Sequence, residues 1–254
     1  MALLRIRDVS RVFTENGKKT EVLSHISLDV EEEQFVAIVG PSGSGKSTLL
    51  RMVVGLDEPT TGSITYRGRP VRDAVSEGKI AIVFQSFALF PWLTVMGNVE
   101  VALEARGVPP EERRRRADGY IDKVGLDGFE EAYPRELSGG MKQRVGIARA
   151  LAVEPELLCM DEPFSALDAL TAQALREEVL SLWNDDALPV TSVIMVTHSI
   201  DEAVLMADRI VVLSRRPATV VADIAVALPR PRSLKDPAVQ EQIDGVYSCV
   251  LGEP

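Results

Sequence analysis

Two adjoining stretches decide the fold: Phe35-Val36-Ala37-Ile38-Val39 and Gly40-Pro41-Ser42-Gly43-Ser44-Gly45-Lys46-Ser47-Thr48. The first is an apolar run without polar alternation, which is typical of a strand buried on both faces of a parallel sheet. The second fits the pattern G-x-x-x-x-G-K-[S/T], and residues 48–52 favour a helix. A strand, a glycine-rich loop and a helix in this order predict a phosphate-binding loop.

The residue types in this loop suit phosphate chemistry. Glycines let the backbone N–H groups turn toward a phosphate, and the following helix N-terminus adds partial positive charge. The Lys46 ammonium can reach the β- and γ-phosphates, and the Ser47 hydroxyl can bind Mg²⁺. We expect the nucleotide to be bound by Gly40, Ser42, Gly43, Gly45, Lys46, Ser47 and Thr48.

Further short apolar runs predict the rest of an α/β fold with a parallel sheet. They lie at residues 80–84, 157–160, 193–196 and 210–213. Residues 4–7 and 26–30 alternate between apolar and polar, which favours an antiparallel edge sheet with one solvated face. Residues 87–151 have helical periodicity and could be an inserted helical subdomain.

Two of the predicted strands end in residues that carry chemistry. Asp161 and Glu162 follow one run, and Thr197 and His198 follow another. Ligands of open α/β sheets bind at the carboxyl ends of strands. Asp161 is the candidate for holding Mg²⁺ through water, and Glu162 for orienting or deprotonating an attacking water.

A third motif, Ser138-Gly139-Gly140, stands at the start of a periodic helix that continues with Met141. A hydroxyl, two flexible residues and a helix N-terminus make a second anion site. The alternative is a serine N-cap followed by two loop glycines. A second anion site would cover the face of the γ-phosphate that the first loop leaves open. It could do so from the same chain or from another copy of the chain.

Taken in order, these motifs resemble the nucleotide-binding subunits of ATP-binding-cassette transporters over nearly the whole chain. The matches are residues 40–48 to Walker A, Gln85 to the Q-loop, residues 137–143 to the signature, residues 157–162 to Walker B, residues 165–168 to the D-loop and His198 to the switch histidine. The resemblance implies a P-loop NTPase (RecA-like) core with an antiparallel β subdomain and an inserted helical signature subdomain. Residues 1–86 and 152–228 would form the core with its β subdomain, residues 87–151 the helical subdomain and residues 229–254 a C-terminal tail.

The resemblance also implies a site shared by two subunits, which in this family close head to tail around two ATP molecules. Lys46 of one copy would then bind the same γ-phosphate as the signature residues Ser138, Gly139 and Gly140 of the other copy. Asp168 would lie across the dimer seam.

Three more residues receive roles from the resemblance. Gln85 would contact Mg²⁺ and water, and His198 would bind the γ-phosphate. Phe13 would stack on adenine, with a core phenylalanine as the alternative. His25 has no such context and is expected to be structural.

The resemblance predicts partners as well. In the family, the segment corresponding to Phe87-Ala88-Leu89-Phe90-Pro91-Trp92-Leu93-Thr94-Val95 forms a groove for a membrane permease, and core packing of its aromatic residues is the alternative. The chain would lie on the cytoplasmic side of the membrane and act with a permease and a solute-binding protein. Residues 90–95, the signature with Met141 and the tail from Leu213 to Arg232 resemble the nitrate, sulfonate and taurine importer group. Met141 stands where the broad family usually has Gln, and Ala218 stands where the related subfamily often has Gly.

The composition and net charge exclude several other classes of protein. The chain has 254 residues, 46% of them hydrophobic, and a formal net charge of −10, which excludes dominant disorder and argues against a nucleic-acid partner. Two cysteines and two histidines exclude a disulfide framework and make a structural zinc site improbable. The alternatives that remain are an exporter or lipid-trafficking ATPase and, less favoured, a cassette ATPase outside transport. A P-loop kinase or GTPase leaves Ser138-Gly139-Gly140 and His198 unexplained.

Overall fold

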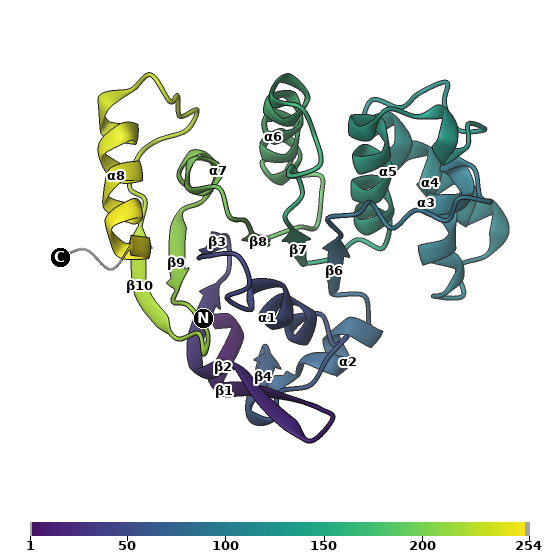
Figure 1. Ribbon diagram of the computed structural model, residues 1–254. Coiled ribbons are helices and arrows are strands. Elements are labelled where there is room, and N and C mark those ends of the chain that lie inside the picture. The colour runs from purple at the N-terminus through teal and green to yellow at the C-terminus, as the bar shows by residue number, and fades with distance from the viewer. Residues whose placement is uncertain (1, 252–254) are drawn as a thin grey trace. The chain divides into compact units, whose positions relative to one another are not determined.

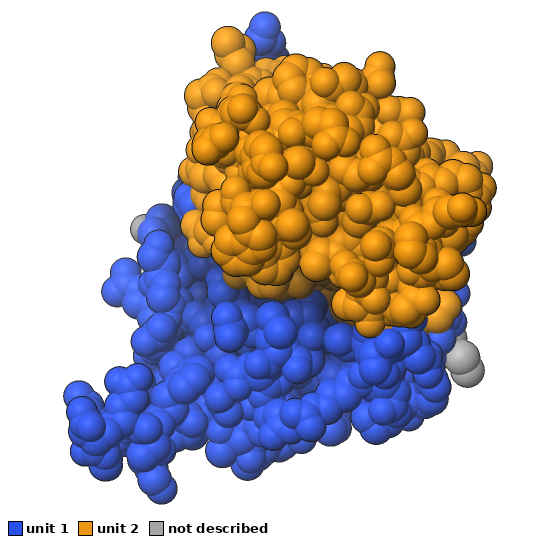
Figure 2. Space-filling view, turned by 90° about the vertical axis from the view of Figure 1, so that its right-hand side faces the viewer, with its two compact units in different colours: residues 1–77, 191–254 blue, residues 78–190 orange. Residues whose placement is uncertain are grey.

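The computed structural model describes residues 2–251. The chain forms two compact units, which Figure 2 colours separately. The first joins residues 1–77 to residues 191–254, and the second comprises residues 78–190. Among residues 2–251, no helix has both the length and the apolar character that crossing a bilayer requires. The boundaries expected after residues 86, 151 and 228 stay predictions.

The first unit contains an antiparallel sheet, visible in Figure 1. Its strands run in the order β2 (Lys18–Glu31), β1 (Ala2–Glu15), β4 (Thr61–Tyr66) and β5 (Arg69–Pro70). Asn16-Gly17, a dipeptide favoured in tight hairpins, connects the first two strands. Leu4 and Ile6 are buried whereas Arg5 and Arg7 are exposed, so the sheet has one solvated face. The expected antiparallel β subdomain is confirmed.

The same unit contains strands of a mainly parallel sheet. They run in the order β10 (Val220–Ala225), β9 (Arg209–Leu213), β3 (Phe35–Val39) and β8 (Ser192–Val196). Every residue of β3 and β8 is buried, as their uninterrupted apolar sequences predict. The two strands are parallel with Ile38 opposite Val196. The loop after β3 and the loop after β8 therefore start at the same edge of the sheet.

Four helices complete the first unit: α1 (Lys46–Val53), α2 (Val71–Ser76), α7 (Ile200–Met206) and α8 (Pro237–Leu251). The segment before α8 is bound to the end of α7, because the Arg232 guanidinium donates to the carbonyls of Val204 (2.7 Å) and Ala207 (2.6 Å). Burial lowers the pKa of Arg232 to about 10. Arg232 thus satisfies carbonyls that a helix C-terminus leaves unpaired.

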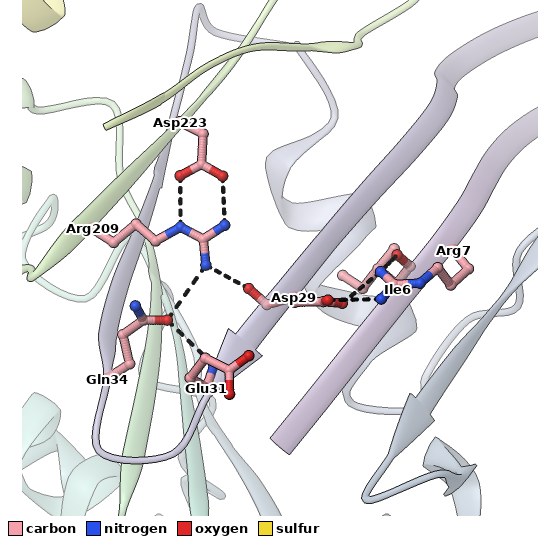
Figure 3. A network of polar contacts seen from close by, with 7 residues as sticks. All are labelled: Ile6, Arg7, Asp29, Glu31, Gln34, Arg209 and Asp223. Atoms are coloured by element: carbon pink, nitrogen blue, oxygen red, sulfur yellow. Dashed lines mark hydrogen bonds and ion pairs between the residues drawn. The ribbon is translucent and has the colours of Figure 1, made fainter. Parts of the chain in front are cut away.

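Arg209 links the two sheets of the first unit (Figure 3). Its guanidinium makes two hydrogen bonds to the Asp223 carboxylate, at 2.6 and 2.5 Å, and donates to the carbonyl of Asp29 at 2.7 Å. The Asp29 carboxylate accepts a hydrogen bond from Arg7 at 2.7 Å, which lowers the pKa of Asp29. One arginine therefore joins β9 and β10 to β2, and through Asp29 to β1.

The second unit holds β6 (Ile80–Val83) parallel to β7 (Leu157–Asp161), the helices α3 (Val95–Glu104), α4 (Pro110–Lys123), α5 (Gly139–Ala152) and α6 (Ala169–Trp183), and the 3₁₀ helix η1 (Pro134–Glu136). Helices α3, α4 and α5 pack on one another. This confirms the helical character expected for residues 87–151.

The arginine run of α4 differs from a fully solvated helix face. Arg114 and Arg115 are exposed, but the side chains of Arg113 and Arg116 are only 19% and 23% exposed. Arg116 pairs with Glu154 at 2.9 Å, just beyond the end of α5. Half of the run therefore joins helices together, because long arginine stems can pack along apolar surface while their charged ends stay paired.

Candidate functional site

The glycine-rich loop between β3 and α1 has a backbone that only glycine fits. Gly45 has φ 103°, and a Cβ there would lie 2.8 Å from Val22 Cγ1 and 2.9 Å from Leu23 Cδ2. A Cβ on Gly40 would lie 2.6 Å from the carbonyl oxygen of Leu213. The loop is therefore wrapped tightly against β2 and β9 and leads into the N-terminus of α1, the kind of helix end that binds anions.

Lys46 and Ser44 supply the polar interior of this loop. The Lys46 side chain is buried, and its Nζ donates to the carbonyls of Gly40 (2.9 Å) and Pro41 (3.2 Å). Ser44 is 1% exposed, and its hydroxyl has no hydrogen-bond partner among the described residues. A buried unpaired hydroxyl is costly unless a ligand satisfies it. The loop thus fits the phosphates of a nucleotide, and Ser44 is a loop residue that the sequence analysis did not single out.

Phe13 lies beside the loop and is not a core residue. It lines a cavity of about 500 Å³ together with Glu15, Asn16, Lys18, Thr20, Val22, Thr48 and Arg216. The guanidinium of Arg11 lies over its ring, 4.5 Å from the centroid. Arg11 is in turn fixed by the Asp57 carboxylate at 2.5 Å. One face of the Phe13 ring is therefore covered by a held cation, which orients the ring at the cavity.

His198 follows β8 at the sheet edge from which the loop also starts. The N–H of Thr197 donates to the carbonyl of Ile38 at 3.2 Å, which ties this segment to β3. Ser199 caps α7 through its hydroxyl, so the position of His198 is fixed from both sides. In the first unit, Phe13 therefore shares a cavity with Thr48 of the loop, and His198 lies at the sheet edge where the loop begins. His25 lies elsewhere, exposed and paired with Asp8 at 2.7 Å.

In the second unit, Gln85 and Glu162 meet in a polar cluster. The Gln85 Nε2 donates to Glu162 Oε2 at 3.1 Å and to Ser165 Oγ at 3.2 Å. The Ser165 hydroxyl donates to the Glu162 carbonyl at 3.0 Å. Glu162 has φ 43°, a conformation that costs a non-glycine residue free energy and is often found at functional sites. Glu162 and Asp161 stand at the end of β7, as the sequence predicts.

The signature and D-loop segments are neighbours in this unit. Ser138 is the N-cap of α5, and its Oγ accepts a hydrogen bond from the Met141 N–H at 3.3 Å. Asp168 is the N-cap of α6, where hydrogen bonds from Thr171 lower the pKa of its carboxyl. A Cβ on Gly140 would lie 2.5 Å from Thr171 Cγ2. The start of α5 therefore abuts the start of α6, and Gly139 and Gly140 make this approach possible.

A strained turn after Gln85 is held by α5. Phe87 and Ala88 have φ values of 61° and 48°, which are uncommon for residues with a side chain. Arg149 of α5 donates to the carbonyl of Phe87 at 3.0 Å and to that of Ala88 at 2.7 Å. Burial lowers the pKa of Arg149, and the two carbonyls accept hydrogen bonds from its charged guanidinium.

The segment beyond this turn presents aromatic side chains. Phe90 and Trp92 are 38% and 70% exposed, and their ring centroids are 5.4 Å apart. Asn98 is buried, accepts a hydrogen bond from the Phe90 N–H at 2.7 Å and donates to its carbonyl at 3.1 Å. The alternative that both rings belong to the core is therefore wrong for Phe90 and Trp92.

The family model for ABC transporters matches residues 23–165, more than half of the chain. The chain belongs to this family. It is one of the family's ATP-binding and ATP-hydrolysing cassettes, which confirms the resemblance drawn from its motifs.

Relatives and a solved structure support the same assignment. The nitrate import ATP-binding protein NrtD of Synechocystis is 46% identical over 89% of this chain and 83% of its own length. The aliphatic sulfonates import ATP-binding protein SsuB of Bacillus licheniformis is 42% identical over 93% of this chain and 90% of its own length. The ATP-binding cassette MJ0796, solved as a dimer bound to ADP and Pi, is 33% identical with a TM-score of 0.77, covering 89% of this chain and all of that one.

Proposed function

We propose that this cassette powers the import of a small anionic solute, such as nitrate, a sulfonate or taurine, through a separate membrane permease. The supporting observation is its 46% and 42% identity to ATP-binding proteins named for nitrate and sulfonate import, and 43% to one named for taurine import. An exporter or lipid-trafficking ATPase remains the alternative. The anionic solute would be bound by other subunits, among them a solute-binding protein.

Uptake of labelled solute tests this proposal. Cells without the chain should lose uptake of radiolabelled nitrate, taurine or an alkanesulfonate, and the unaltered chain should restore it. A Glu162→Gln chain should not restore uptake if hydrolysis drives transport. Normal uptake of all of these solutes together with accumulation of a lipid or an exported compound would favour the alternative.

The proposal gives each polar residue of the site a role in ATP hydrolysis. Lys46 binds the β- and γ-phosphates, and Glu162 takes the proton from the attacking water. His198 donates a hydrogen bond to the γ-phosphate. Residues 40–48 bind the phosphate chain through N–H groups and hydroxyls, and Phe13 stacks on adenine.

A magnesium ion is implied by this chemistry. Ser47 and Asp161 offer a hydroxyl and a carboxylate, the oxygen ligands that Mg²⁺ prefers beside phosphate, and Gln85 offers an amide oxygen. The Gln85 Nε2 donates hydrogen bonds to Glu162 and Ser165, so the Oε1 atom is the one that can serve as a metal ligand. When bound, Mg²⁺ neutralises charge that develops on the phosphates.

The proposal also includes a homodimer, or a heterodimer with a paralogue, with two composite ATP sites. In each, Lys46 of one copy and the segment Ser138-Gly139-Gly140 of the other bind the same γ-phosphate, with Asp168 near the seam. The α5 N-terminus supplies a hydroxyl and a positive dipole end for this purpose. MJ0796, which shares the fold, was solved as a dimer.

Mixing two inactive variants tests whether Ser138 acts in the partner's site. A heterodimer of Lys46→Ala and Ser138→Ala chains has one doubly altered site and one intact site if the sites are composite. We therefore expect ATP hydrolysis in the mixture to exceed the sum of the two variants measured alone. If Ser138 acts in its own chain's site, each site carries one substitution and mixing restores nothing.

The permease is proposed to bind the surface around residues 87–95. Exposed aromatic side chains such as Phe90 and Trp92 are typical anchors of protein interfaces. Trp92→Ala should weaken binding to the permease by about tenfold or more, as for an interface hot spot. The isolated chain should keep its thermal midpoint, because Trp92 is mostly exposed.

Binding of the purified chain to permease in detergent or nanodiscs measures this effect. Tyr247→Ala is the matched control, because Tyr247 is an exposed aromatic residue of α8 in the other unit. Equal affinities for the Trp92 and Tyr247 variants would contradict the assignment of this surface.

A further inference from the structure

Arg216 lies in the turn between β9 and β10 and touches the phosphate-binding loop. Its Nε donates a hydrogen bond to the carbonyl of Gly43. Its Nη2 lies 3.9 Å from the place that a Cβ on Gly43 would occupy. Arg216 lines the Phe13 cavity and also a groove formed by Pro41, Ser42, Gly43, Ser44 and Arg215. Arg216 therefore borders both the Phe13 cavity and this groove.

The turn that carries Arg216 is anchored at both of its ends. The Ala218 N–H donates to the carbonyl of Val22, and the Ala218 carbonyl accepts from the Ser24 N–H, both at 2.9 Å. The Thr219 carbonyl accepts from the Ser214 N–H at 3.0 Å. The guanidinium is therefore presented from a fixed backbone, so little conformational freedom is lost when it binds a ligand.

The charge of Arg216 is not neutralised by the protein. Among residues 2–251, no carboxylate lies within ion-pair distance of its guanidinium, although the chain has 38 acidic residues and 28 basic ones. Arg11, which lies over the Phe13 ring, is by contrast paired with Asp57. An uncompensated guanidinium fixed at the rim of a cavity suits an anionic ligand, and especially phosphate oxygens.

We propose that Arg216 is a nucleotide-binding residue that contacts the phosphate chain near its ribose end and holds the loop at Gly43. The cavity supports this position because it places Arg216 with Thr48, at the start of α1, and with Phe13. This inference rests on the proposed placement of the base at Phe13. ATP and ADP share the part of the nucleotide concerned, so Arg216 contributes equally to the binding of both.

Calorimetric titration with ADP, in which no hydrolysis occurs, tests the proposal. Arg216→Gln should raise the dissociation constant for ADP about tenfold, as expected for the loss of a hydrogen bond to a charged group. The constant for ATP should rise by the same factor, and adenosine should bind as before. In hydrolysis assays KM should rise while kcat stays unchanged, which is the signature of uniform binding. Arg216→Lys, which keeps the charge, should recover part of the affinity.

Arg215→Gln is the matched control, because it removes the same charge from the same turn without a side-chain bond to the loop. Equal increases of the ADP dissociation constant in the two Gln variants would overturn the proposal, because they would show that Arg216 acts only through its charge. A dissociation constant within twofold of the unaltered chain would also overturn it. Lys46→Ala measured in parallel distinguishes this proposal from the proposed function. Loss of ADP binding in the Lys46 variant supports nucleotide binding by residues 40–48, independently of the result for Arg216.

Discussion

Replacing Glu162 by Gln should lower the rate of ATP hydrolysis by roughly 10²–10⁴-fold, the range expected when a general base is removed. Glutamine has the same shape, and its side-chain oxygen can still accept the hydrogen bond that Gln85 donates to Glu162. The cluster with Ser165 should therefore stay intact, and nucleotide binding should be retained. With hydrolysis stopped, we expect ATP to hold two copies together.

Turnover under saturating ATP and size-exclusion chromatography with and without ATP measure both effects. Glu177→Gln on the exposed side of α6 is the matched control and should leave turnover unchanged. Undiminished hydrolysis by the Glu162 variant would remove Glu162 from the role of base. A monomer in the presence of ATP would count against the two-copy site.

Lys46→Ala should weaken the binding of ATP and ADP by at least roughly hundredfold, because two or more charge-assisted hydrogen bonds to phosphate are lost. The Lys46 ammonium lies inside the loop, where its Nζ donates to the carbonyls of Gly40 and Pro41. No other basic side chain is present in residues 40–48 to replace it.

Equilibrium dialysis with radiolabelled ADP checks this result without relying on activity. Arg51→Ala is the control, since Arg51 is an exposed cation in the last turn of the same helix, α1. Near-normal ADP affinity of the Lys46 variant would show that the nucleotide is bound elsewhere in the chain.

Much of the fold could be predicted because its strands have two distinct sequence patterns, one apolar throughout and one alternating between apolar and polar residues. Residues 35–39 and 193–196 are apolar throughout and form buried parallel strands, while residues 4–7 alternate and form part of an antiparallel strand with one solvated face. The ends of β7 and β8 were predictable for the same reason, since Asp161 follows one apolar run directly and His198 follows another after Thr197.

The contacts that complete the site could not be predicted in this way. Arg216 and Gly43 are 173 residues apart, and no local pattern marks that arginine among its neighbours. Ser44 is an unspecified position in the loop pattern, and its unpaired burial emerges only when β2 and β9 close around the loop. Ser165 was matched only as the first residue of the D-loop, and no local pattern marks its contacts with Gln85 and Glu162.

The hydrogen bonds from Arg149 to the turn after Gln85 restrict the number of residues that this turn can contain. One guanidinium donates to two adjacent carbonyls, so a residue inserted between Phe87 and Ala88 would separate them and place at least one beyond its hydrogen-bonding distance. Surface loops normally tolerate such changes in length. This one should not: a single glycine inserted there should change the spacing between Gln85 and the aromatic surface at Trp92.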